Sequence, residues 1–379
     1  MLRPELLRVF AVSFGAMVGV ALLMSVVPLY AASAGAGDAG AGLTTGVLMV
    51  TTVAAELATP RLMARFGFRL AIGAGLLLLG VPVLALIGSA HLAVILAVCA
   101  VRGLGFGVVV VVGSALVATT VPPERRGEGL GLYGVVMGLP TVLVLPLGVF
   151  LVEQIGYDPV FVIAAVAALA GLVVVPGLPG RRPEPAAAPV GVVAAIRDGR
   201  LLRPSLVFSA CALAAGVVVT FLPLAVTGAT AGLAALALLV QAVTSTFTRW
   251  WAGRYGDRRG PARLLIPSLL AAVAGVLLLV FTGHPVAVLA GMVLFGAGFG
   301  ASQNASLALM FDRVASAGYG AVSALWNLAY DGAMAVGAAG YGVLAAQTGY
   351  PVAFALTGAL MLVALVPAVR DARRDLHVR

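Results

Sequence analysis

The chain has 379 residues, of which 62% are hydrophobic and 10% are charged, and its formal net charge is +9. Soluble domains are about half apolar and about a quarter charged, so this composition excludes an ordinary soluble protein. A positive charge alone does not indicate nucleic-acid binding, because the distribution of the charge matters more than its total. We predict an integral membrane protein with no nucleic-acid partner.

Twelve apolar runs are long enough to cross a bilayer, whose hydrocarbon core takes about 20 helical residues. The first run exceeds the ~7–15 apolar residues of a secretory signal, so we interpret it as a membrane helix. The runs do not alternate polar with apolar residues, which argues against a membrane β-barrel. In chain order they cover approximately 7–30, 43–60, 69–89, 92–119, 128–152, 159–177, 204–226, 230–251, 263–282, 285–309, 319–346 and 351–369.

The arginines give the orientation of these helices. All 23 basic residues are arginine, and an N-terminus on the inside places 22 of them in cytoplasmic segments and none in the external loops. Cytoplasmic loops of membrane proteins are enriched in this way. We therefore expect both termini in the cytoplasm. The remaining arginine, Arg102, falls inside the fourth apolar run.

Two halves of the sequence resemble each other at an offset of 193 residues. This shift aligns RGLGFG at Arg102 with FGAGFG at Phe295, and QIGYDPVF at Gln154 with QTGYPVAF at Gln347. Six helices in each half give the halves the same orientation in the membrane. We predict an N-terminal six-helix bundle over 1–177, a cytoplasmic linker rich in Pro, Ala and Arg over 178–203, and a C-terminal bundle over 204–379.

A polar segment between the eighth and ninth runs carries a recognisable motif. It reads GRYGDRRG, with Gly253, Asp257, Arg258 and Gly260 at the spacing G-x-x-x-D-R-x-G. This motif, with the whole-length pattern of twelve runs, resembles the major facilitator superfamily (MFS) of transporters. The resemblance implies an all-helical twelve-span fold and a cytoplasmic clasp that locks one conformation. An ordinary positive-inside loop would explain the arginines alone.

The corresponding segment of the first half departs from this pattern. It keeps Arg65, Gly67 and Arg69, but Pro60 replaces the usual glycine and Ala64 the usual aspartate. These two replacements argue against a cytoplasmic clasp that works in the family's usual way in this chain.

Arg102 lies among glycines spaced like a nucleotide-binding loop. Such a loop follows a strand, whereas helix-length apolar sequence flanks Arg102 on both sides. We expect Gly103, Gly105 and Gly107 to allow close helix packing. At ~1.5 Å rise per residue, Arg102 would lie ~15 Å deep. It resembles an arginine of the family's fourth helix that is found in many proton-linked members.

Two acidic residues within apolar runs are candidates for proton coupling. Asp331 falls near the middle of the eleventh run and Glu56 in the inner part of the second. Ionisable residues inside membranes are functional by default. Structural alternatives stay open: Asp331 pairing with Arg102 or with Asn327, and Glu56 serving a cytoplasmic charge network.

Few polar residues lie on the helices expected to line a cavity, which favours a hydrophobic or amphipathic substrate over a sugar. Each is also compatible with ordinary helix packing. The cavity candidates are Met24, Phe221, Gln241, Gln303, Asn304, Trp326, Asn327 and Tyr330.

The sequence shows no catalytic cluster and no metal-ligand spacing. We therefore expect no enzyme activity, no metal and no cofactor, with a proton gradient as the source of energy. Cys99 and Cys211 are expected to be buried thiols. The hypothesis is a proton-coupled MFS exporter (an antiporter) of a small hydrophobic or amphipathic drug or metabolite.

The hypothesis places this exporter, as a monomer in the lipid bilayer, in the bacterial cytoplasmic (inner) membrane. Export is favoured by a resemblance to the fifth helix of antiporters, in which Leu139 interrupts the usual Gly-Pro step; the matching residues are Gly134, Gly138, Pro140, Pro146 and Gly148. The alternatives are a proton-coupled importer of a small metabolite and a membrane sensor without transport.

Overall fold

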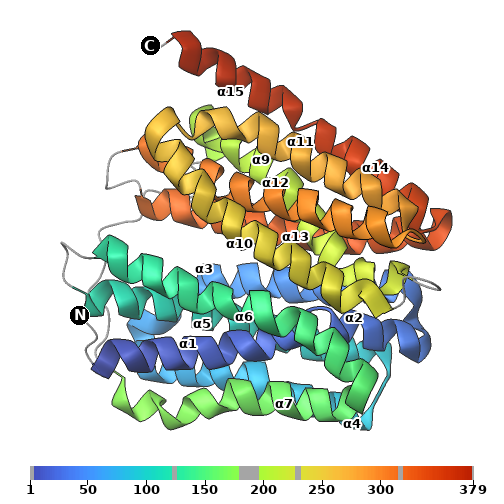
Figure 1. Cartoon of the computed structure of the whole chain (residues 1–379). Helices are drawn as coiled ribbons and strands as arrows, with labels where there is room; N and C mark the ends of the chain where they lie inside the picture. Colours follow the sequence, from blue (N-terminus) through green and yellow to red (C-terminus); the bar gives the residue numbers. More distant parts are fainter. Residues whose placement is uncertain (1–3, 122–125, 179–195, 227–231, 315–318, 378–379) are drawn as a thin grey trace. The chain divides into compact units, whose positions relative to one another are not determined.

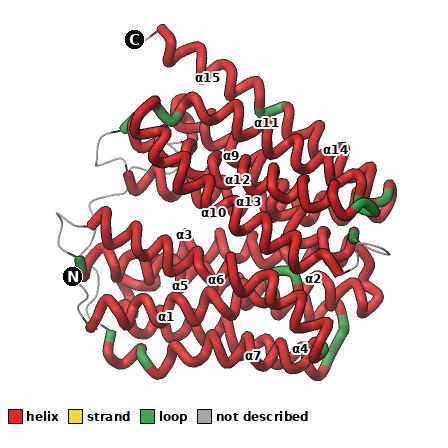
Figure 2. The backbone as a smooth tube through the Cα atoms, in the orientation of Figure 1, coloured by secondary structure: helices red, strands yellow, loops and turns green. Residues whose placement is uncertain are grey.

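A computed structural model describes residues 4–121, 126–178, 196–226, 232–314 and 319–377. These residues form helices and short connections, with no strand among them, as Figure 2 shows. Eight helical segments within the described residues are long and apolar enough to cross a membrane. The prediction of an all-helical membrane protein is therefore confirmed.

The chain divides into two compact units, residues 1–186 and 187–379. In the first unit, α3 packs along α5, and α1 packs against both α6 and α7 (Figure 1). The helices of this unit are α1 (Pro4–Leu23), α2 (Val26–Ala31), α3 (Gly37–Gly80), α4 (Ala85–Gly88), α5 (Leu92–Thr120), α6 (Arg126–Ile155) and α7 (Tyr157–Ala170), with a π-helical turn at Ala32–Ala36 and 3₁₀ turns at Val81–Leu84, Gly171–Val173 and Val175–Gly177.

In the second unit, α10 and α11 both pack against α12, and α9 packs against α13. Its helices are α9 (Gly199–Ala225), α10 (Ala234–Arg259), α11 (Ala262–Leu278), α12 (Pro285–Asp312), α13 (Tyr319–Thr348), α14 (Tyr350–Leu362) and α15 (Leu365–His377), with a 3₁₀ turn at Leu279–Phe281. Most of the expected linker lies outside the described residues.

Glycines with positive φ fall at equivalent places in the two units. Gly67 interrupts α3 with φ 79°, and Gly260 ends α10 with φ 86°. Gly156 (φ 79°) separates α6 from α7, and Gly349 (φ 77°) separates α13 from α14. Only glycine adopts this backbone conformation readily. Both pairs are 193 residues apart, so the repeat seen in the sequence is also present in the backbone.

The glycines after Arg102 pack α5 closely against α3, as expected. A side chain at Gly103 would collide with the carbonyl of Leu48, and one at Gly105 would lie 2.6 Å from the carbonyl oxygen of Gly75. In the second unit, the equivalent Gly296 packs against the carbonyl of Gln241 in the same way. Small residues permit such close approach of helix backbones.

Several helix boundaries differ from the sequence expectation: the expected run 43–60 and the first part of the run 69–89 lie in α3, which begins at Gly37, is interrupted only at Gly67 and ends at Gly80. The first expected run, 7–30, is divided, because α1 ends at Leu23 and α2 begins at Val26. The eighth, 230–251, continues as α10 to Arg259, so most of the expected loop motif is helical. The length of an apolar run does not reveal the division of the first run. It also does not reveal the extension of α10, because arginine is a good helix former and the helix continues beyond the apolar residues.

Candidate functional site

Arg102 is a fully buried ionisable side chain of the first unit. It lies on α5, ten residues after the helix begins, and its side chain is 1% exposed. Its Nη2 donates one long hydrogen bond, 3.4 Å, to the carbonyl oxygen of Gly19 on α1. Its Nε has no hydrogen-bond partner among the described residues. The guanidinium carries five N–H donors, so most of its bonding capacity is unused.

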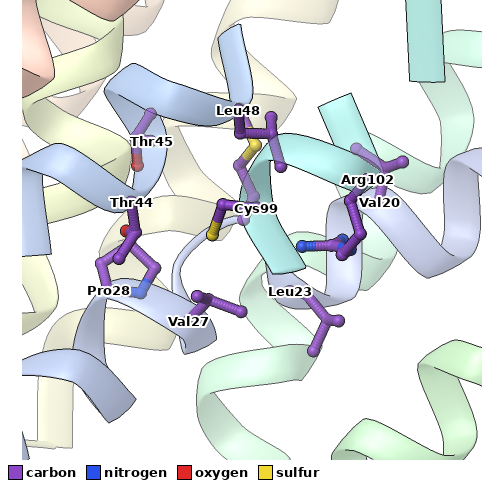
Figure 3. Close-up of a pocket in the computed structure, with 10 residues that line it drawn as sticks. Val20, Leu23, Val27, Pro28, Thr44, Thr45, Leu48, Cys99 and Arg102 are labelled. Carbon is purple, nitrogen blue, oxygen red and sulfur yellow. The ribbon is translucent and has the colours of Figure 1, made fainter. Parts of the chain in front are cut away.

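A small cavity of about 10 Å³ lies beside this guanidinium (Figure 3). A volume of this size is at the lower limit for one water molecule. Residues from α1, α2, α3 and α5 surround it, and none of them is acidic. They are Val20, Leu23, Met24, Val27, Pro28, Thr44, Thr45, Leu48, Cys99 and Arg102.

The cavity brings together two of the residues predicted from the sequence, Arg102 and Met24. Glu56, the third ionisable candidate of the membrane region, lies on α3 two helical turns beyond Leu48 and is half-buried. Neither Glu56 nor Arg102 forms an ion pair with any residue of the described part of its unit.

Asp331 lies on α13 of the second unit, twelve residues after the helix begins, and is 6% exposed. The neighbouring Tyr330 interacts electrostatically with both Asp331 and Arg249 of α10. Arg249 lies ten residues before the end of α10. In the second unit, an acid and a phenol on α13 are therefore within electrostatic range of an arginine on α10.

Stacked aromatic rings lie next to this group. The rings of Phe208 and Trp326 are 4.4 Å apart and almost parallel, at 8°. Tyr330 stacks on Phe208 at 5.8 Å. The indole nitrogen of Trp326 donates a hydrogen bond of 3.1 Å to Ser306 Oγ. Sequence reasoning found Trp326 and Tyr330, which are four residues apart on one helical face, but missed Phe208, which no spacing distinguishes from a packing residue.

The other cavity candidates of the second unit lie in different surroundings. Phe221 is fully buried against Tyr341, with ring centroids 4.7 Å apart. The carbonyl of Gln303 accepts a hydrogen bond from Ser306 Oγ. Asn304 lines a separate hollow described below. Asn327 is half-buried on α13, one turn before Asp331.

The GRYGDRRG motif borders an open hollow of about 810 Å³ in the second unit. Gly253, Arg258 and Gly260 contribute to its wall, together with Asn304. The backbone of Asp257 lies in the last turns of α10, and its side chain is outside the described part. The remaining wall includes three more arginines, Arg259, Arg263 and Arg313.

An ion-pair network in the second unit holds α15 against α12 and α9. Asp371 is 2% exposed, and Arg313 donates two hydrogen bonds to its carboxylate, at 3.0 and 2.8 Å. Arg203 adds a weaker contact of 3.8 Å. Sequence reasoning missed this network because nothing in the local sequence links residues 203, 313 and 371.

The first unit uses backbone carbonyls at the equivalent place. Arg8 donates to the carbonyl oxygen of Gly177 at 2.8 Å, and Arg69 donates to that of Leu178. Leu178 occupies the position that the 193-residue offset assigns to Asp371. Arg69 therefore fixes the end of the sixth apolar segment. Arg65 instead lies over the ring of Phe66, at 5.2 Å.

Comparison with known proteins identifies the architecture. The family model described as Major Facilitator Superfamily matches residues 9–338 and 206–377. An uncharacterized MFS-type transporter of Burkholderia mallei (strain SAVP1) is 36% identical over 115 residues, which cover 28% of this chain and only 26% of that protein. The chain thus matches about a quarter of the length of this relative.

Two solved structures share the fold at low sequence identity. The nucleoside transporter NupG has a TM-score of 0.77 and 10% identity, with 97% of this chain and 99% of that chain covered. A bacterial homolog to the human lysosomal transporter Spinster, in an inward-facing and occupied conformation, has a TM-score of 0.78 and 14% identity, with 98% of each chain covered.

Proposed function

Because this chain belongs to the major facilitator superfamily, we propose that it is a proton-coupled carrier that exports a small hydrophobic or amphipathic compound by alternating access. The two units would expose a binding site to each side of the membrane in turn. The proposal includes twelve membrane spans, cytoplasmic termini and a place in the bacterial cytoplasmic membrane. The arginine distribution and the bacterial relatives support these points.

The observation that carries proton coupling is the burial of ionisable side chains within long apolar helices. Asp331 is buried twelve residues into α13, and Arg102 is buried ten residues into α5. A charge at mid-membrane costs at least about 2.5–3.5 kcal/mol, so residues of this kind are retained for a function. We assign the exchanged proton to Asp331, with Glu56 as a second acid.

The chemistry of the described side chains favours an apolar substrate. Half-buried Trp326 and Tyr330 stack on the fully buried ring of Phe208, and Trp326 already directs its N–H to Ser306. Sugars require many fixed hydrogen-bonding groups, which these helices lack. No catalytic role is assigned to the chain, and the proposal requires no metal or organic cofactor, because the proton gradient supplies the energy.

Transport into inverted membrane vesicles tests the proposal. A pH gradient should drive accumulation of a neutral hydrophobic dye by the wild type. Asp331→Asn should lose gradient-driven accumulation but keep exchange of internal for external dye, because a neutral side chain cannot carry the proton. Asp158→Asn is the matched control, since Asp158 is exposed in the first turn of α7. An unchanged proton dependence in Asp331→Asn would remove Asp331 from this role.

Two further outcomes would redirect the proposal. Gradient-driven accumulation in right-side-out vesicles, without accumulation in inverted ones, would identify an importer. Absence of exchange by purified protein in liposomes, for dyes that bind it, would favour a sensor over a carrier.

A further inference from the structure

The regular α-helical hydrogen bonding of the helix that opens the first unit is interrupted at Met24 and Ser25, beside Arg102, although Ser25 keeps α-helical dihedrals. α1 ends at Leu23 and α2 begins at Val26. Pro28 contributes to the break, because it has no N–H to donate to the carbonyl of Met24 four residues before it. Irregular backbone at membrane depth occurs where it lines a cavity, and broken helices mark the binding sites of many carriers. Leu23, Met24 and Pro28 all line the cavity at Arg102.

This break has no counterpart in the second unit. The equivalent helix, α9, runs without interruption from Gly199 to Ala225, although it contains Pro204 and Pro223. The position equivalent to Arg102 is Phe295, which is 1% exposed and stacks on Phe299 at 5.8 Å. Helix packing therefore requires neither the break nor the arginine, and both features occur at the same cavity.

The cavity holds a positive charge with unused donors and no negative charge in its wall. Arg102 makes one long hydrogen bond, and its Nε has no partner among the described residues. The other lining residues are apolar apart from Cys99 and the hydroxyls of Thr44 and Thr45. A guanidinium matches the two oxygens of a carboxylate with parallel N–H donors, and this match is strongest away from water.

We propose that Arg102 binds the carboxylate of an amphipathic organic monoanion, with the apolar part of that molecule against Leu23, Val27 and Leu48. The inference rests on the proposed carrier function and names its substrate class. One guanidinium balances one negative charge, so a monocarboxylate fits better than a dianion. The cavity of about 10 Å³ must widen to admit the ligand. The cavity can widen by a change in the flexible side chain of Met24 and by movement at the adjacent interruption of the helix.

Binding to the purified full-length protein in lipid nanodiscs tests this inference without requiring transport. The probes are octanoate and octanamide, which share the alkyl chain and differ in charge, with sodium chloride as the inorganic anion. Thermal stabilisation gives an apparent Kd for each probe. The variants are Arg102→Gln and Arg102→Lys, with Arg263→Gln as the control, because Arg263 is exposed and outside the cavity.

We expect octanoate to bind the wild type at least about tenfold more tightly than octanamide, since hydrogen bonds between two charged groups are stronger than those to a neutral amide. Arg102→Gln should abolish this preference while keeping octanamide binding, which also shows that the variant is folded. Arg102→Lys should show part of the preference for octanoate, and Arg263→Gln should keep the full preference. Equal binding of the two probes, or a preference that survives in Arg102→Gln, would overturn the inference.

The outcome is separable from that of the carrier proposal. If octanoate binds through Arg102 but is not exchanged across liposomes, the site stands and the transport proposal fails. If a neutral dye is transported with proton coupling while octanoate shows no preference, the carrier stands and the carboxylate site fails. If chloride alone binds through Arg102 and octanoate does not displace it, the organic carboxylate is excluded.

Discussion

α5 of the first unit and α12 of the second have the same backbone packing and different chemistry. Gly105 contacts Gly75, and Gly298 contacts Ser268, at positions that the 193-residue offset makes equivalent. Before these glycines, Arg102 stands in one unit and Phe295 in the other. The comparison shows that glycines allow the close helix contacts in both units, whereas the buried side chain that precedes them differs between the units.

The largest expected effect tests the shared packing. Gly105→Ala and Gly298→Ala would each place a Cβ within 3 Å of backbone atoms. Because backbone cannot move aside as a side chain can, we expect each to lower the free energy of unfolding by about 3 kcal/mol or to prevent folding. Thermal midpoints of the purified variants measure this effect.

The control for this prediction is Gly134→Ala, because a Cβ at Gly134 meets nothing within 4 Å. It should leave the midpoint unchanged. Strong destabilisation at Gly105 with none at Gly298 would show that the two helices do not share one packing arrangement.

A second effect concerns the ends of the two units. Arg313→Gln should destabilise by about 3 kcal/mol, because it leaves the buried Asp371 carboxylate without its bidentate partner. Arg8→Gln removes only a bond to the Gly177 carbonyl, and about 1 kcal/mol is expected. Unfolding midpoints compare the two. Equal losses would indicate that the charged network in the second unit adds nothing to the carbonyl contacts in the first.

The smallest effect is at the start of α9. Asp198 caps this helix, and the backbone N–H of Arg200 is the main cause of the lowered pKa of its carboxyl group. Asp198→Ala should cost about 1 kcal/mol at pH 7. Because the pKa is lowered on folding, the contribution is present above the unfolded pKa of about 3.9 and is lost as the pH falls through the folded value.

Stability measured against pH, with Glu5→Ala at the equivalent position of α1 as the comparison, tests this effect. A loss in Asp198→Ala that is the same at pH 7 and at pH 3 would contradict the cap.

Sequence patterns predicted those parts of the molecule that depend on periodicity or on special backbone conformations. Apolar runs indicated the helices, and the aligned Gly67 and Gly260 appear in the structure as matched positive-φ residues. Arg102 was predicted to be a buried charge because it is an arginine within an apolar run. The Asp371 network and the ring stack at Phe208 were not predictable, because they join residues far apart in sequence and carry no local signal.

The central claim is that Arg102 is kept for transport and not for stability. Arg102→Met, which removes the charge at similar side-chain length, tests it when the thermal midpoint and exchange of octanoate per folded molecule are measured on one preparation. We expect a midpoint equal to or above that of the wild type, because a buried charge without an ion-pair partner is removed, and we expect exchange to fall at least about tenfold. A lower midpoint with exchange retained would contradict it.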